Sequence, residues 1–239
     1  MKTPEELVRP EILALQAYPV AEAEGMVKLD AMENPYRLPE PLAKQLAERL
    51  AKVAINRYPD PTAPRLRARL AQAMRVPAGY EIVLGNGSDD LIQIVSFTLA
   101  RPGAVMLTPE PTFVIYRINA NLSGMRFVGV PLRSDLDLDY EATLAAVREQ
   151  QPALVFLAYP NNPTGVLYAE HQVAEIIRAT PGLVVLDEAY HVYARRSFLP
   201  RLAEFENLAV MRTVSKMSLA GIRLGYLVSR AGWAAQFNK

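Results

Sequence analysis

The sequence predicts an α/β protein whose mainly parallel sheet is covered by helices on both faces. Short apolar runs rich in β-branched residues alternate with longer amphipathic stretches along most of the 239 residues. Several of the short runs, such as ALVFLAY and GLVVLDE, are continuously apolar, which is typical of strands buried on both faces. Regular alternation of such strands with helices favours parallel pairing.

Each expected element follows from this alternation. Helical periodicity is found at about Pro41–Val53, near Arg65–Met74 and, farther along, at Ser88–Leu99, Tyr140–Glu149 and Ala169–Ala179. The expected strands are Glu81–Leu84, Ala104–Leu107, Arg126–Val130, Ala153–Leu157, Leu183–Leu186, Leu208–Arg212 and Gly225–Ser229.

Two parts of different character are expected. Residues 1–40 contain many prolines and no clear strand–helix unit, so we expect an N-terminal arm. Residues 41–239 carry the alternating pattern and are expected to form one large domain. The chain stops at Lys239, just as a helix after Arg230 would begin, whereas domains usually end in a docked element. We therefore expect the large domain to be incomplete at its C-terminal end.

Composition excludes several classes of function. The formal net charge is +1 without a dominant basic segment, so neither nucleic acid nor a membrane is an expected partner. Cysteine is absent, which excludes disulfides and thiolate sites. His171 and His191 lie apart and without a carboxylate cluster, so neither a metal site nor a Ser-His-Asp triad is expected. The charged start of the chain lacks the apolar core of a signal peptide, and a cytoplasmic location is expected.

A glycine-rich turn follows the first expected strand and opens a helix. It reads Gly85-Asn86-Gly87-Ser88-Asp89-Asp90. Glycine permits a sharp turn, and free N–H groups at a helix start suit a phosphate group. Ser88 or Asp89 acting as a plain helix cap is the alternative. The turn lacks the third glycine of a dinucleotide fingerprint, and the sequence has no GxxxxGK[ST] phosphate loop.

A second turn, from Tyr159 to Gly165, follows the strand ALVFL. Its sequence is YPNNPTG, and its prolines and glycine favour a rigid turn at the strand end. An asparagine held there can donate a hydrogen bond to a ligand oxygen. A loop without a ligand is the alternative.

The strand LVVL ends in Asp187, with Tyr190 three residues farther on. A carboxylate at the end of a buried strand is costly to ionise without a cationic partner. The partner could be Mg²⁺, as in an ATPase, or a protonated pyridine nitrogen. The missing phosphate loop argues against Mg²⁺.

Lys216 lies in the segment RTVSKMSLAGIRLGY, beside Ser215 and seven residues before Arg223. A single lysine is usually a solvated surface charge. This one follows a strand in a cationic, hydroxyl-rich loop, where a depressed pKa would make its amine nucleophilic.

In this order and spacing, the four segments resemble the fold-type I pyridoxal-phosphate aminotransferases of class I and II. The resemblance implies a seven-stranded, mostly parallel sheet and pyridoxal 5'-phosphate as cofactor. It implies that Lys216 is the Schiff-base lysine and that Asp187 keeps the pyridine nitrogen protonated. The other cofactor residues that it implies are Tyr190 and Asn162 at the phenolic oxygen, Ser215, Arg223 and the amides of Gly87, Ser88 and Asp89 at the phosphate, and Phe113 stacked on the ring.

Within that superfamily the chain is most similar to histidinol-phosphate aminotransferases. The similarity rests on RPEILALQAYP, Glu33-Asn34-Pro35, NRYPD, GNGSDD and SKMSLAGIRLGY. It implies a homodimer in which Tyr58 reaches the partner's cofactor phosphate, and a substrate site that includes Tyr18, Asn34 and Asn162.

The implied reaction is transamination of L-histidinol phosphate with 2-oxoglutarate, giving imidazole-acetol phosphate and glutamate in histidine biosynthesis. Members of that family continue into a C-terminal small domain with substrate-binding arginines, so we expect a chain that ends at Lys239 to turn over poorly or not at all. The motifs do not separate this reaction from that of an aromatic amino acid aminotransferase or a threonine-phosphate decarboxylase. A cofactor-sensing regulator is disfavoured, because the arm has no room for a DNA-binding domain.

Overall fold

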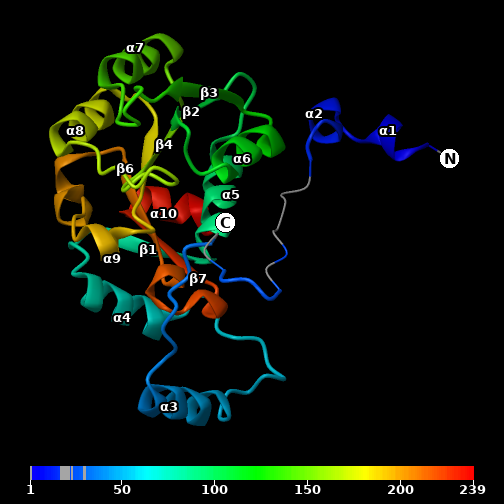
Figure 1. Cartoon of the computed structure of the whole chain (residues 1–239), viewed down its shortest axis with the longest axis vertical. Helices are drawn as coiled ribbons and strands as arrows, with labels where there is room; N and C mark the ends of the chain where they lie inside the picture. Colours follow the sequence, from blue (N-terminus) through cyan, green and yellow to red (C-terminus); the bar gives the residue numbers. More distant parts are fainter. Residues whose placement is uncertain (1, 17–21, 23, 29–30) are drawn as a thin grey trace.

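One seven-stranded sheet forms the centre of the computed structural model, which describes all residues except 1, 17–21, 23 and 29–30 (Figure 1). Its strand order is β1-β7-β6-β5-β4-β2-β3. Pairing is parallel except at β7, which runs antiparallel to both β1 and β6. The expected mainly parallel sheet is thus confirmed, and every predicted strand is present within a few residues. The strands are β1 (Tyr80–Asn86), β2 (Val105–Glu110), β3 (Arg126–Pro131), β4 (Leu154–Ala158), β5 (Leu183–Asp187), β6 (Leu208–Thr213) and β7 (Leu224–Arg230).

Helices cover both faces of the sheet, as expected. The helices α4 (Pro64–Met74), α7 (Tyr140–Gln150) and α8 (Glu170–Ala179) pack on one face, together with the 3-10 helix η1 (Leu199–Glu204). On the other face lie α5 (Ser88–Leu99), α6 (Ile115–Ser123) and α10 (Ala231–Phe237).

The continuous apolar strands are explained by these two layers. Alternate residues of a strand point to opposite faces. In β5, Val184 and Leu186 therefore belong to one apolar cluster, whereas Leu183 and Val185 belong to the other. All four are fully buried, and each contributes about 1.5–3 kcal/mol of hydrophobic free energy.

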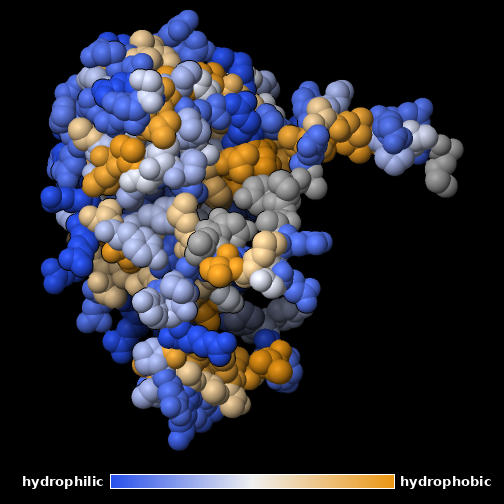
Figure 2. Space-filling view, viewed as in Figure 1, coloured by the Kyte–Doolittle hydropathy of each residue, from blue (hydrophilic) through white to orange (hydrophobic). Residues whose placement is uncertain are grey.

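The N-terminal part stands away from the sheet. The helices α1 (Pro4–Leu7), α2 (Pro10–Leu13) and α3 (Glu40–Leu50) bury no residue, and Figure 1 shows α1 and α2 projecting to one side and α3 below the body. The space-filling view shows apolar side chains at the surface of this lower end (Figure 2). The exposed apolar side chains here are those of Leu42, Leu50, Val53, Ile55 and Tyr58.

The parallel strands bring their carboxyl ends to one edge of the sheet. The loops that leave this edge contain three short helices, α9 (His191–Ala194), η2 (Ser215–Met217) and η3 (Ala220–Ile222). Ligands of open α/β sheets bind outside such carboxyl ends. None of the described helices is long and apolar enough to cross a membrane.

Candidate active site

A cavity of about 300 Å³ opens at the carboxyl edge of the sheet. Its walls come from the loops after β1, β2, β4, β5 and β6, from the loop before β7, and from the arm segment Ala31–Glu33. Residues far apart in the sequence are thus brought together. The predicted site residues that line it are Ser88, Asp89, Phe113, Asn162, Asp187, Tyr190, Ser215, Lys216 and Arg223.

Asp187 is the buried carboxylate of this cavity, with 5% of its surface exposed. The Tyr116 hydroxyl donates a hydrogen bond to its Oδ2 at 2.7 Å, and the Ala189 backbone N–H donates to its Oδ1 at 3.0 Å. Burial raises the pKa of Asp187 to about 6, although both hydrogen bonds oppose that rise. The carboxylate is therefore charged at neutral pH and lacks a cationic hydrogen-bond partner among the described side chains, which suits a cationic group of a ligand.

Tyr116 is a site residue that the sequence analysis missed. Its ring is fully buried and stacks on Phe156 at 4.6 Å between ring centroids. It follows Phe113 by three residues, and the two rings meet edge to face at 5.7 Å. Phe113 precedes α6 and Tyr116 lies in its first turn, so this aromatic pair at the start of the helix was the available signal.

Lys216 projects its amine into the cavity from η2. Its Nζ donates a hydrogen bond to the backbone carbonyl of Ala31 at 2.8 Å and lies 5.3 Å from the centroid of the Tyr190 ring. Burial lowers the pKa of this amine, and the carboxylates of Glu33, Asp89 and Asp187 oppose the change. A lysine that loses its proton more easily is a better nucleophile.

Tyr190 and Asn162 provide neutral hydrogen-bonding groups at the cavity wall. Burial and the Asp187 charge raise the pKa of Tyr190 to about 12, so its phenol keeps its proton and can donate. The neighbouring Asn161 is buried and has a different use: its amide donates to the Pro111 carbonyl and to Thr164, and accepts from Thr112. Asn161 thus fixes the turn, and Asn162 faces the cavity.

The start of α5 and the Arg223 side chain form a cradle for an anion. The cap residue of α5 is Gly87, not Ser88 or Asp89, and none of the described side chains caps the first N–H groups of the helix. Gly87 has φ +86°, and a Cβ there would lie 2.5 Å from Arg223 Nη2. The positive φ, which L side chains rarely adopt, and the closeness of Arg223 together favour glycine at this position. Gly225 packs on the same turn, since its Cβ would lie 2.7 Å from the Ser88 nitrogen.

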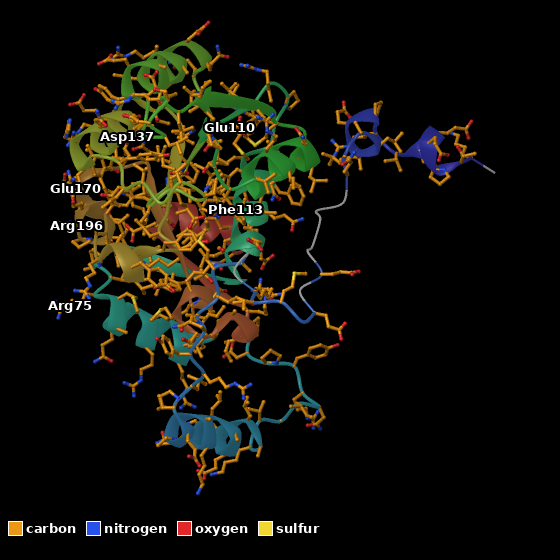
Figure 3. All side chains as sticks on the ribbon, in the orientation of Figure 1. Arg75, Glu110, Phe113, Asp137, Glu170 and Arg196 are labelled. Atoms are coloured by element: carbon orange, nitrogen blue, oxygen red, sulfur yellow. The ribbon has the colours of Figure 1, made fainter. Side chains whose placement is uncertain are left out.

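Ser215 and Phe113 also line the cavity. Thr213 Oγ1 donates a hydrogen bond to Ser215 Oγ at 2.9 Å, which orients the serine hydroxyl. Phe113 lies near the middle of the molecule, beside α5, whereas Glu170 and Arg196 are at the far edge (Figure 3). The cavity lining thus combines aromatic, cationic and hydroxyl side chains.

Of the predicted side chains that the structure describes, those of Tyr58 and Asn34 do not line this cavity. Tyr58 is fully exposed, at 101%, on the loop after α3. Asn34 does not line the cavity, and its side chain accepts a hydrogen bond from the Tyr36 N–H at 3.0 Å, whereas the adjacent Glu33 does line it. Tyr18 lies outside the described residues. The roles assigned to these three residues stay predictions.

The residues present fit pyridoxal phosphate. An amine for its aldehyde, a buried carboxylate for its ring nitrogen and a phenol for its phenolic oxygen line one cavity with a glycine-dependent anion cradle. A volume of about 300 Å³ suits a small cofactor, because ligand pockets start at about this size.

Comparisons with known proteins agree with this site. The family model for aminotransferases of class I and II matches residues 24–239. Histidinol-phosphate aminotransferase 1 of Burkholderia lata is 56% identical over 240 residues, covering 100% of this chain and 67% of that protein. The histidinol-phosphate aminotransferase of Chromobacterium violaceum is also 56% identical, covering 99% and 67%.

A solved structure agrees as well. Histidinol-phosphate aminotransferase from Sinorhizobium meliloti, in complex with pyridoxal-5'-phosphate, superposes with a TM-score of 0.82 at 31% identity, covering 97% of this chain and 65% of that one. The chain thus spans about two thirds of the length of these relatives. Fold, cavity and sequence similarity agree, and the chain belongs to the class I and II aminotransferase family, whose cofactor is pyridoxal phosphate.

Proposed function

We propose that this chain carries the cofactor site of an enzyme that transaminates L-histidinol phosphate with 2-oxoglutarate, a step of histidine biosynthesis. The observation that carries the proposal is the single cavity that contains Lys216, buried Asp187 and the Gly87–Arg223 cradle. The names of the relatives at 56% identity supply the substrate.

The cofactor, when bound, supplies a ring that withdraws electrons from the substrate carbon. Lys216 Nζ would hold the cofactor aldehyde and, once displaced by the amino donor, would carry a proton from the substrate carbon that bears the amino group. Its lowered pKa favours the neutral amine that this step requires. The charged Asp187 carboxylate would keep a proton on the ring nitrogen, because it has no other cationic hydrogen-bond partner in the described chain.

The remaining residues would orient and hold the cofactor. Tyr190 O–H and the Asn162 amide would donate to its phenolic oxygen, and Phe113 would cover its ring. Arg223, Ser215 and the first N–H groups of α5 would bind its phosphate, where the helix dipole adds to the positive potential. We assign these roles from their places around the cavity.

Helix α3 and the loop that follows it support the further proposal of a homodimer. Tyr58 is fully exposed, and the apolar side chains of Leu42, Leu50, Val53 and Ile55, on α3 and the loop after it, are exposed as well. Exposed apolar patches of this kind mark interaction sites. In a dimer, Tyr58 would reach the cofactor phosphate of the partner chain. Tyr18 and Asn34 would contact the substrate in the same assembly.

The division into an arm, residues 1–40, and a large domain, residues 41–239, belongs to the same proposal. The projection of α1 and α2 to one side of the body supports the arm (Figure 1). A cytoplasmic location, expected from the sequence, is part of it too, since the reaction is one of biosynthesis.

The test is a single-turnover comparison of amino donors. The chain is loaded with pyridoxal phosphate, and loss of the visible absorbance of the cofactor is followed after addition of L-histidinol phosphate, phenylalanine or threonine phosphate. The proposal predicts the fastest loss with L-histidinol phosphate. A faster reaction with phenylalanine or threonine phosphate would assign the chain to an aromatic aminotransferase or a decarboxylase. Absorbance that none of the three changes would indicate a protein that binds the cofactor without catalysis.

A further inference from the structure

A buried ion pair lies directly behind the candidate site. Glu188 follows Asp187 in sequence, and Arg212 lies in β6 four residues before Lys216. Arg212 Nε and Nη2 both donate to Glu188 Oε2, at 2.9 and 2.8 Å. Glu188 is fully buried and Arg212 is 5% exposed, and neither lines the cavity.

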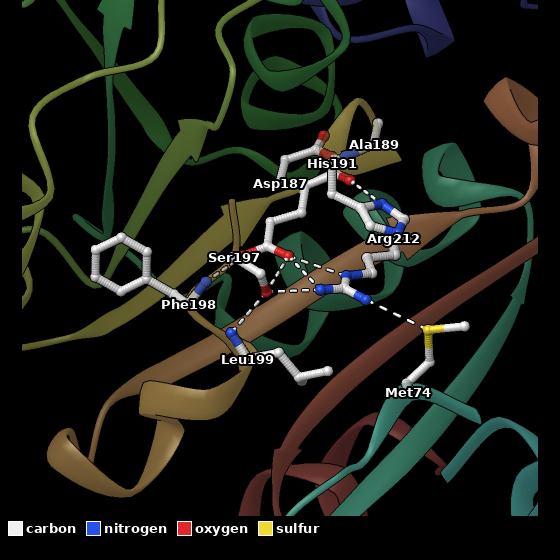
Figure 4. A network of polar contacts seen from close by, with 9 residues as sticks. Met74, Asp187, Ala189, His191, Ser197, Phe198, Leu199 and Arg212 are labelled. Carbon is white, nitrogen blue, oxygen red and sulfur yellow. Dashed lines mark hydrogen bonds and ion pairs between the residues drawn. The ribbon is translucent and has the colours of Figure 1, made fainter. Parts of the chain in front are cut away.

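Further hydrogen bonds hold the Glu188 carboxylate from the next loop (Figure 4). Ser197 Oγ donates to Oε2 at 2.8 Å, and the Phe198 backbone N–H donates to Oε1 at 2.6 Å. Arg212 Nη2 also donates to Ser197 Oγ at 2.6 Å. Several partners therefore fix the orientation of both charged side chains. We call the hydrogen-bonded set of Glu188, Arg212 and Ser197 the Glu188–Arg212–Ser197 network.

Two separate routes connect this network to Lys216. The first runs along β6, from Arg212 through Thr213 to η2. The second runs through α9: the Glu188 carbonyl accepts from the His191 N–H at 3.0 Å, and Tyr193 on the same helix donates its hydroxyl hydrogen to the Lys216 carbonyl at 3.0 Å. The Glu188 N–H also donates to the Met211 carbonyl at 2.8 Å, which joins the ends of β5 and β6.

A contribution to folding stability does not by itself explain why two charged side chains are buried here. Replacing a buried ion pair by apolar side chains of similar volume is often neutral or stabilising, because both charges lose their hydration. Alternation along the strands explains what the pair can do instead. Glu188 and Arg212 extend the apolar face of Val184, Leu186 and Val210, while their neighbours Asp187 and Thr213 face the cavity from the opposite side.

We propose that Glu188 and Arg212 are positioning residues that fix Asp187 relative to Lys216, so that one cofactor ring reaches both. This inference rests on the proposed cofactor site. One end of the ring must meet a carboxylate on β5 while its aldehyde meets an amine on the loop after β6. Asp187 ends β5 and Lys216 follows β6, and the Glu188–Arg212–Ser197 network joins these two strand ends on the side away from the ligand.

The test compares two ligands that differ at one group. Pyridoxal 5'-phosphate needs Asp187, the phosphate cradle and Lys216 together, whereas pyridoxine 5'-phosphate has no aldehyde and cannot be linked to Lys216. The double variant Glu188→Gln with Arg212→Met removes both charges, and the glutamine still accepts from Phe198 N–H and donates to Ser197. Dissociation constants of both ligands are measured for this variant and for the unaltered chain, together with thermal melting.

The proposal predicts that the double variant melts within a few degrees of the unaltered chain. It also predicts that the ratio of the pyridoxal phosphate dissociation constant to the pyridoxine phosphate dissociation constant rises about tenfold, because misplacing a reacting group by a fraction of an ångström has effects of this order. Glu206→Gln, which breaks the exposed ion pair with Arg230, serves as the control and leaves the ratio unchanged. An unchanged ratio in a folded double variant overturns the proposal, because a merely structural pair would affect both ligands alike.

Ser197→Ala is a milder second variant, should the double variant not fold. It deletes one hydroxyl of the network, keeps the ion pair, and is expected to raise the same ratio about threefold, as the loss of one hydrogen bond implies. An unchanged ratio in that variant overturns the proposal as well. The test uses no amino substrate, so failure of L-histidinol phosphate to react does not affect it. Absence of the visible absorbance in the unaltered chain would instead contradict the cofactor site itself.

Discussion

Asp187→Asn is expected to stabilise the cofactor-free protein above about pH 6, although it removes a central residue of the proposed site. Burial raises the pKa of Asp187 from 3.8 to about 6 in the folded chain. The folded state therefore holds this proton more tightly than the unfolded state does. The folded protein therefore loses stability as the pH rises from about 4 to above 6. In this range the Asp187 carboxyl ionises readily in the unfolded chain and is still largely protonated in the folded chain.

The size of the effect follows from the shift. Two pKa units at about 1.4 kcal/mol each give a cost of about 3 kcal/mol at pH 8. Asparagine has nearly the same shape and no charge. Its oxygen can accept from the Ala189 N–H, and its amide can donate to the Tyr116 hydroxyl oxygen. For a chain of this length, about 3 kcal/mol corresponds to an increase in Tm of about 6–12 °C.

The assay is thermal unfolding of both cofactor-free proteins between pH 4 and pH 9. The difference in Tm should be near zero at pH 4, grow through pH 6 and stay constant at higher pH. Glu149→Gln, at an exposed carboxylate, is the matched control and should give no such curve. A variant that is less stable at pH 8, or a difference that does not depend on pH, would refute the reasoning about the buried charge.

Three other predictions concern the Tyr116 hydrogen bond to Asp187, the Gly87–Arg223 anion cradle and the homodimer. Tyr116→Phe removes the donor to Asp187 Oδ2 and should destabilise the cofactor-free protein at pH 8 by about 1–3 kcal/mol, measured by denaturant titration, because the lost bond is to a charged group. Gly87→Ala should weaken pyridoxal phosphate binding at least about tenfold in a spectroscopic titration, because its Cβ would displace Arg223 and φ is +86°. The control is Gly103→Ala, which also has a positive φ, +76°, but open space around it, and which should keep the affinity of the unaltered chain. Light scattering after size-exclusion chromatography should give twice the mass of the chain, and Ile55→Glu should reduce it to one chain. Equal affinities for the two glycine variants, or a single-chain mass for the unaltered protein, would contradict these accounts.

Much of the fold could be predicted because its strands are buried on both faces. In a chain with regular strand–helix alternation, a continuous apolar run of the length of β4 or β5 is compatible with few structures other than a buried strand of a parallel sheet. The single antiparallel strand, β7, could not be recognised, because its direction depends on pairing with β1 and β6 and not on its own pattern.

The site was predicted where a motif lies at a strand end, and missed where a contact depends on the fold. Asp187 ends one buried strand and Lys216 follows another, so the sheet itself places them at one edge. Tyr116 meets Asp187 from a helix 71 residues away in sequence, and Lys216 meets Ala31 across 185 residues. Such pairs carry no local pattern. The Glu188–Arg212 pair was overlooked for the same reason, since each residue alone reads as an ordinary charge.

The measurement that tests the central claim most directly is the identification of the lysine that holds the cofactor. The chain is loaded with pyridoxal phosphate, reduced with borohydride and digested, and the modified peptide is located by mass spectrometry. The account predicts one modified lysine, Lys216, and no stable label in Lys216→Ala. A label on Lys28, Lys44 or Lys52, or none in the unaltered chain, would contradict it.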